Sequence, residues 1–342
     1  MQQKDIARTN GNLLSVALSY TIYEPGGYLG WCLSRFWGVG NWSSTLTQRL
    51  ETDPVDSMEI EDIIGAYNNW EIENSKLNYF EGVDLAEVSS HYCRDNGWRD
   101  DRGFEQWDKV ATWSANLVRR NINYRILGAK ELADPEMLCK EDTPLILDGV
   151  GCMSDDQFKA VKIYLSKGGT AWLALPFGTH DEKGFKRAFP LSEELLSSGY
   201  KNLSFIDTAS AADPLEKLIR EGLLHPVIEQ LSGDDGWAVR IRYYGDKPAI
   251  HFLNTALEAV AHPELKDFLG IPVLKDVNTK IGNNNLTYKI NRKKVPVSNL
   301  SVMSPELGQV SQKAELLSIN ENFVTINVNL QGVKVYAVVQ TV

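Results

Sequence analysis

The sequence predicts an α/β layer with a parallel sheet, preceded by a helix-strand-helix segment and followed by an antiparallel β-sandwich. Two observations carry this prediction. Between residues 83 and 175 strand-like and helix-like runs alternate, which is typical of a parallel sheet covered by helices on both faces. From Trp237 onward apolar and polar residues alternate with a period of two, and turn signals separate the runs. The predicted parts are 1–80, 81–210 and 211–342.

The clearest unit of the α/β layer lies between residues 143 and 175. Its apolar runs 145–147 and 171–175 predict two buried strands. Between them, Ser154 and Gln157 have the spacing of a capping box, and two glycines mark the end of the predicted helix. Strand, helix and strand in this order predict a right-handed crossover between parallel strands.

The same patterns extend the layer to both sides. Apolar positions at helical spacing and short β-branched or aromatic runs predict strands at 83–89, 124–127 and 203–206 and helices at 100–121, 130–138 and 192–198. The layer is therefore predicted to be flavodoxin-like.

The C-terminal part reads as a series of short strands. Runs 237–243 and 249–254 flank a Gly-Asp-Lys-Pro turn and predict a hairpin. Further strands are predicted at 286–290, 300–303, 323–328 and 333–339. In the first 80 residues we predict a helix over 4–24 that Pro25 ends, a strand over 28–38 and a helix over 56–80.

The helix that starts at Ser154 and ends in YLSKGGT, with an apolar strand on each side, resembles the amidotransferase-like trimerisation domain of family 42 glycoside hydrolases, the β-galactosidase type. In that family the domain follows a catalytic (β/α)8 barrel and precedes a small β-sandwich. The resemblance implies that 1–80 is the end of a barrel, that 81–210 is the trimerisation-type domain, and that the catalytic glutamates lie before Met1.

The resemblance thus implies a non-catalytic C-terminal portion or subunit of a glycoside hydrolase, which supplies oligomer contacts and part of a sugar-binding site. The expected partners are a carbohydrate and either further copies in a trimer or a chain with the rest of the barrel. A self-contained carbohydrate-binding or assembly protein is the alternative. An amidotransferase-type enzyme with Cys152 as the nucleophile is a third possibility.

Composition excludes several classes of function. A net charge of −10, without a dense block of Lys and Arg, argues against nucleic acids and anionic membranes as partners. Apolar runs stay far below the ~20 residues that cross a bilayer, and the N-terminal residues lack the pattern of a signal peptide. We therefore expect a cytoplasmic protein. Four scattered cysteines predict neither a metal site nor a disulfide framework, and no cofactor is expected.

Trp31, Arg35 and Trp37, together with Trp42, are the predicted substrate-binding residues. Sugar rings stack on aromatic side chains, and a guanidinium group holds a hydroxyl or a carboxylate. The resemblance places Trp31 or Trp37 at the floor of a sugar subsite. The alternative is that these large aromatic side chains fill a core.

Three other groups were weighed as sites. Cys152 with His262 imitates a thiol nucleophile and its base, but the second glycine of a nucleophile elbow is missing after the cysteine. His91, Cys93 and Asp95 are too few for a metal site. The acidic residues between 53 and 62 are explained by the start of a helix. No catalytic residue is predicted in this chain.

Overall fold

The computed structural model describes residues 24–37, 65–75, 77, 81–93, 95–96, 103–141, 143–206, 214–220, 222–266, 272–309 and 312–341. The chain divides into two compact units. One comprises Met1–Leu85, Val118–Asn121 and Val227–Val342, and the other comprises Ala86–Leu117 and Ile122–Pro226. The first and third parts predicted from the sequence therefore belong to one unit.

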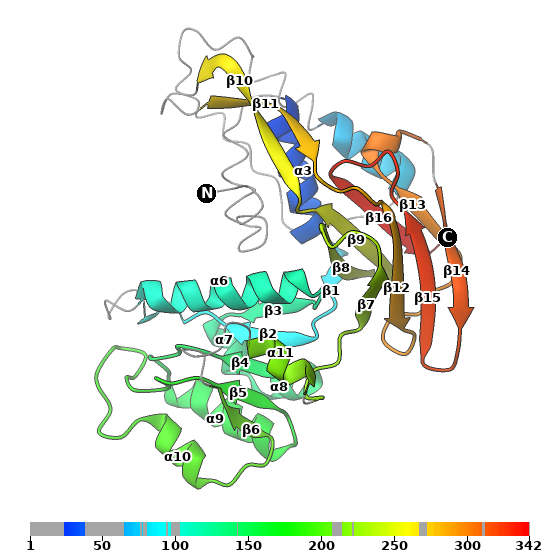
Figure 1. Ribbon diagram of the computed structural model, residues 1–342. Helices are drawn as coiled ribbons and strands as arrows, with labels where there is room; N and C mark the ends of the chain where they lie inside the picture. Colours follow the sequence, from blue (N-terminus) through cyan, green and yellow to red (C-terminus); the bar gives the residue numbers. More distant parts are fainter. Residues whose placement is uncertain are drawn as a thin grey trace. The chain divides into compact units, whose positions relative to one another are not determined.

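The second unit contains a five-stranded parallel sheet with the strand order β3-β2-β4-β5-β6 (Figure 1). Numbered within the unit, this order is 2-1-3-4-5, which is the flavodoxin-like order. The parallel layer predicted from the sequence is thus confirmed. Its strands are β2 (Val88–His91), β3 (Tyr124–Leu127), β4 (Leu145–Leu147), β5 (Ala171–Leu173) and β6 (Leu203–Phe205).

Both faces of the parallel sheet are covered. Leu145 and Leu147 of β4 join one core cluster, whereas Ile146 between them points to the opposite face and is also fully buried. The apolar character of the whole strand follows from this double burial. The helices of the unit are α6 (Gly103–Arg119), α7 (Ala129–Leu132), α8 (Pro135–Glu141), α9 (Asp155–Ser166), α10 (Leu191–Ser197) and α11 (Pro214–Arg220).

Helix α9 begins as the sequence predicts. The Ser154 hydroxyl accepts a hydrogen bond from the Gln157 amide at 3.2 Å, and the Gln157 side chain accepts one from the Ser154 amide at 2.9 Å. These two bonds satisfy amide groups that have no partner within the helix. After the helix, Gly168 has a φ of +98°, a conformation that glycine adopts without strain.

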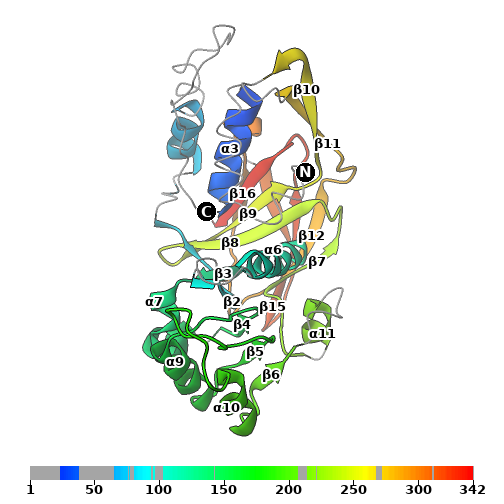
Figure 2. The same ribbon diagram turned by 90° about the vertical axis from the view of Figure 1, so that its left-hand side faces the viewer.

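The first unit is built on a nine-stranded antiparallel sheet with the order β1-β8-β9-β16-β13-β14-β15-β12-β7 (Figures 1 and 2). The predicted hairpin is present as β8 and β9, with Ile241 opposite Ile250. The strands are β1 (Val83–Asp84), β7 (Ile228–Ser232), β8 (Trp237–Tyr244), β9 (Lys247–Asn254), β12 (Asn285–Asn291), β13 (Leu300–Met303), β14 (Gln312–Ile319), β15 (Phe323–Asn329) and β16 (Tyr336–Thr341).

The predicted β-sandwich of separate sheets is wrong in this respect: the strands form one continuous sheet that curls over its own core. Phe252 of β9 and Tyr288 of β12 are five strands apart in the order, yet their ring centroids lie 5.6 Å apart. Inward-facing residues from both ends of the sheet belong to one hydrophobic cluster. Alternation therefore predicts which residues are buried, but it does not tell a sandwich from a curled sheet.

A separate two-stranded sheet pairs β10 (Leu257–Lys266) with β11 (Pro272–Thr279) in antiparallel register. The sequence analysis did not predict these strands, nor β7 and β14. Polar and charged residues interrupt their apolar positions, so their periodicity is weak.

The strand predicted at 28–38 is wrong, because Glu24–Trp37 forms the helix α3. An apolar run buried on all sides carries no period, and short buried helices and strands then look alike in sequence. Pro25 lies in the first turn of α3, where proline is tolerated, rather than ending a preceding helix. The helix predicted over 4–24 lies outside the described residues.

Residues 65–70 are helical and continue into the π-helical turn η1 (Glu71–Ser75), so the described part of the helix predicted at 56–80 is confirmed. None of the helices in the described ranges combines the length and the apolar character that crossing a membrane requires.

Candidate functional site

The outer face of β12 and β15 is polar because the inner face takes the apolar residues. Leu286 and Val328, which pair across the two strands, are fully buried in the core. Their neighbours Asn285 and Asn329 also pair with each other, and a side chain one position along a strand points to the opposite face. Asparagine side chains therefore face outward from both strands.

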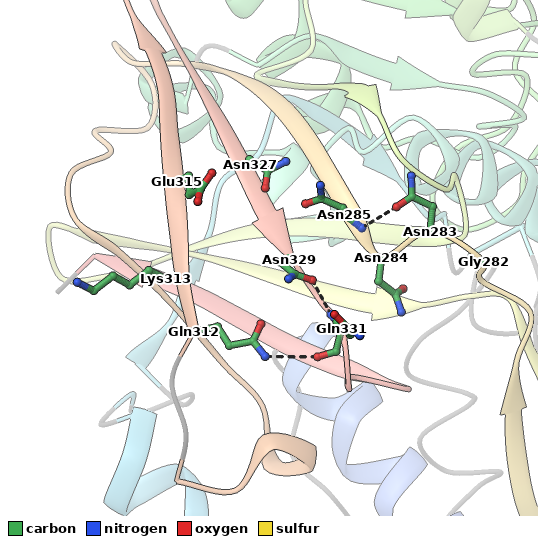
Figure 3. Close-up of a pocket in the computed structure, with 10 residues that line it drawn as sticks. All are labelled: Gly282, Asn283, Asn284, Asn285, Gln312, Lys313, Glu315, Asn327, Asn329 and Gln331. Atoms are coloured by element: carbon green, nitrogen blue, oxygen red, sulfur yellow. Dashed lines mark hydrogen bonds between the residues drawn. The ribbon is translucent and has the colours of Figure 1, made fainter.

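These residues contribute to an open hollow of about 790 Å³ (Figure 3). Seven of the ten lining residues carry a side-chain amide, and the two charged ones, Lys313 and Glu315, have opposite sign. The lining comprises Gly282, Asn283, Asn284, Asn285, Gln312, Lys313, Glu315, Asn327, Asn329 and Gln331. We call this site the amide hollow.

Local hydrogen bonds hold the lining in place. The Asn283 side-chain oxygen accepts from the Asn285 amide at 3.0 Å, and that of Asn329 accepts from the Gln331 amide at 2.9 Å (Figure 3). Such Asx turns occupy the carbonyl oxygen of the side chain. The Gln312 side-chain nitrogen donates to the Gln331 carbonyl at 3.4 Å and ties β14 to this turn.

The amide hollow retains capacity for hydrogen bonds to a ligand. The side-chain oxygen of Gln312 is buried without a hydrogen-bond partner. Each side-chain amide offers donors and acceptors, and each sugar hydroxyl likewise donates and accepts. The lining carries no pair of carboxyl groups, so it offers binding of a neutral, hydroxyl-rich molecule rather than acid-base chemistry.

The predicted substrate-binding residues lie elsewhere, on α3. Trp31 and Arg35 do come together, with the guanidinium 4.9 Å from the centroid of the indole ring. They are buried, however: Trp31 is 0% and Arg35 is 3% exposed, and Trp37 is 8% exposed. Arg35 forms an ion pair with Glu71 at 2.9 Å. Trp42 lies outside the described residues.

Helix α3 covers a face of the curled sheet that carries polar side chains. The Arg240 guanidinium lies 4.8 Å from the Trp37 ring, and Arg240 and Arg242 share Asp84 at 2.8 and 3.0 Å. The edge of Trp31 packs on Tyr336 with 5.7 Å between ring centroids. These internal contacts give the predicted residues a structural role, and sugar binding by them stays a prediction.

His251 lies in the same buried layer. Its Nδ1 is 2.7 Å from the Tyr336 hydroxyl, and its Nε2 is 3.3 Å from that of Tyr244. Burial, with the nearby arginines, lowers the pKa of His251 well below its usual range. Burial also raises the pKa of Glu71, although Arg35 acts in the opposite direction.

The remaining predicted groups do not form a reactive site. Cys152 is 2% exposed, and its amide donates to the Asn96 side chain at 2.8 Å. It pairs with His180 in an isolated bridge, whereas His262 lies in β10 of the other unit.

His91 is buried with its Nδ1 2.8 Å from the Leu127 carbonyl, and burial lowers its pKa. Within the described ranges, no three His, Cys, Asp or Glu side chains are grouped to hold a metal ion. The acidic residues between 53 and 62 lie outside the described residues.

The sequence analysis missed the amide hollow. Its residues come from four separate segments, around 283, 313, 327 and 331, which only the pairing of β12, β14 and β15 brings together. Two signals point to it in retrospect: the run Asn283-Asn284-Asn285, and Asn327 and Asn329 at outward positions of a strand.

No family model and no curated protein matches the sequence. Among solved structures, a rhamnosidase from Novosphingobium sp. PP1Y is similar with a TM-score of 0.52 and 12% identity, over 94% of this chain and 30% of that chain. Gan42B, a GH42 beta-galactosidase, has a TM-score of 0.48 and 12% identity, over 83% and 43% of the two chains.

An exo-carrageenase GH42 from Bacteroides ovatus has a TM-score of 0.46 and 12% identity, over 90% and 39%. This chain thus spans less than half of the length of each of these proteins. The likeness to the rhamnosidase shows that almost the whole chain shares its fold with a part of that enzyme.

Proposed function

We propose that this chain is a non-catalytic, saccharide-binding portion of a glycoside hydrolase-type protein, and that the amide hollow holds the sugar. The observation that carries the proposal is the lining of the hollow, in which seven of ten residues offer side-chain amides and the charges balance. Such a surface exchanges its hydrogen bonds with water for hydrogen bonds with hydroxyl groups, with no net charge to neutralise.

Two further observations support the glycoside hydrolase context. The fold is shared with a part of a protein named as a rhamnosidase. The strand-helix-strand unit at 143–175 resembles the trimerisation domain of family 42 enzymes. On the resemblance alone we also propose that the parallel-sheet unit supplies subunit contacts in a trimer, or contacts to a chain with the rest of a barrel.

The non-catalytic part of the proposal rests on how the described carboxyl groups are used. Burial raises the pKa of Glu71 and of Glu306, as in many acid catalysts. Glu71, however, is paired with Arg35, and Glu306 accepts hydrogen bonds from the amides of Lys334 and Val335 at 2.7 and 3.0 Å. Both groups stabilise the fold through these contacts.

Replacing Asn285 or Asn329 by alanine tests the proposal. We expect each change to weaken binding of a neutral glycan about three- to tenfold, because it removes one or two hydrogen bonds to the ligand. Binding is measured by isothermal titration calorimetry, after a screen of galactan, xylan, glucan, mannan and, as an acidic comparison, polygalacturonate.

Asn278→Ala is the matched control, since Asn278 is exposed on β11 and does not line the hollow. This variant is expected to bind like the unchanged protein. The proposal fails if no glycan of the panel binds, or if Asn285→Ala and Asn329→Ala bind as tightly as the control.

A further inference from the structure

The polar surface continues beyond the amide hollow along the strands. Thr287 of β12 pairs with Asn327 of β15 on one side and with Ser232 of β7 on the other, and Asn327 also pairs with Glu315 of β14. Side chains of directly paired residues share a face of a sheet. This row of hydroxyl, amide and carboxyl groups therefore crosses four neighbouring strands on the outer face.

The next row along the strands is polar as well and has its charges paired. Lys289 lies between Glu229 and Thr325, and its ammonium group is 3.4 Å from the Glu229 carboxylate. The two rows together contain no large apolar side chain. The outer face thus remains close to neutral between the hollow and the far end of the strands.

An aromatic ring stands at that far end. Phe323 pairs with Asn291 on the outer side of the sheet, and the Lys289 ammonium lies 4.5 Å from the centroid of its ring. Phe323 is half-buried, so part of its ring remains accessible. From Asn329 to Phe323 the strand advances by six residues, which is about 20 Å at ~3.4 Å per residue.

From this arrangement we infer that the amide hollow and Phe323 are the two ends of one binding platform for an extended neutral polysaccharide, which runs along β12 and β15. The inference rests on the proposed function. An open hollow that continues into a flat hydroxyl-rich face accommodates the interior of a polymer. An aromatic ring at the end of the face offers an apolar surface for one more sugar ring.

The test is the dependence of affinity on ligand length. Oligosaccharides of increasing length, prepared from the neutral glycan that binds in the screen, are titrated into the unchanged protein and into Phe323→Ala. The affinity of the unchanged protein is expected to rise until the oligomer spans both ends of the platform. Phe323→Ala is expected to lose about two- to tenfold for long oligomers and nothing for short ones.

Two further variants make the result specific. Thr325→Arg places a long charged side chain in the middle of the platform and should weaken only long oligomers. Phe185→Ala removes a 69% exposed phenylalanine from the other unit and should change nothing. Thermal unfolding of each variant shows whether it is folded.

The outcomes separate this inference from the proposed function. If affinity does not depend on length while Asn285→Ala and Asn329→Ala still bind weakly, the hollow is a site for one or two sugar units and the platform is overturned. If glycans of every length fail to bind, the proposed function fails as well. If Phe323→Ala loses short and long oligomers equally, the ring belongs to the hollow and the extended platform is overturned.

Discussion

Buried charge between α3 and the curled sheet governs how single residues behave in the first unit. Arg35, Arg240 and Arg242 share the carboxylates of Glu71 and Asp84 in this layer. His251 lies among them, and it also contacts the hydroxyl groups of Tyr244 and Tyr336. A further positive charge there is unfavourable because burial and the three arginines act in the same direction.

The stability of the first unit should therefore fall in acid. In the unfolded chain His251 takes up a proton near its usual pKa of about 6.5, whereas in the folded protein its pKa is much lower. The unfolded state thus binds more protons below that pH. We expect the free energy of unfolding to be constant with respect to this group above about pH 6.5, and to fall below it by up to about 1.4 kcal/mol per pH unit.

Thermal unfolding between pH 5 and 8 measures this slope. In His251→Gln the part of the slope that belongs to the first unit should disappear. The corresponding change of His91, a buried histidine of the second unit, is the control and should leave the first unit unaffected. A slope that persists unchanged in His251→Gln would contradict the assignment.

At the scale of elements, α9 shows how a local signal fixes a helix. Its capping box is closed by Ser154 and Gln157, and Gln157 also donates to the Ala129 carbonyl at 3.2 Å. Behind the helix, Gly169 leaves room for the Tyr164 ring, since an added Cβ would come within 2.2 Å of it. The start and the end of this element are thus both set by residues that sequence reading recognises.

Ser154→Ala should lower the free energy of unfolding of the second unit by about 1 kcal/mol, because an amide at the start of α9 loses its acceptor. Urea unfolding followed by circular dichroism measures the effect. Ser166→Ala at the other end of the same helix is the matched control: its exposed hydroxyl donates only to the Ile163 carbonyl within the helix. Equal losses in both variants would show that the cap does not stabilise α9.

At the scale of the whole molecule, the chain has two separate hydrophobic cores. One cluster takes its buried members from residues between Val227 and Val339, and the other from residues between Cys93 and Leu195. Each core lies within one of the two compact units. Units with separate cores unfold as separate cooperative blocks.

Calorimetry of the whole chain should therefore show two transitions. Glu71→Gln leaves Arg35 without its charged partner, so it should lower the transition of the first unit alone. Ser154→Ala should lower only the other transition. One transition that both variants shift would mean that the two cores unfold together.

The sequence by itself determined the elements whose signals are local. The cap of α9, the buried strands β4 and β5 and the hairpin of β8 and β9 follow from residues within a few positions of each other. The flavodoxin-like layer follows in turn, because strands that alternate with helices have few ways to pair.

Only the tertiary structure decided the rest. Helix α3 reads as a strand because burial on all sides removes the period that separates the two. The curling of the sheet depends on contacts such as Phe252 with Tyr288, which no local pattern specifies. The amide hollow joins residues up to 49 positions apart, from Gly282 to Gln331. Its chemistry exists only once β12, β14 and β15 have paired, because register brings together side chains that the chain keeps apart.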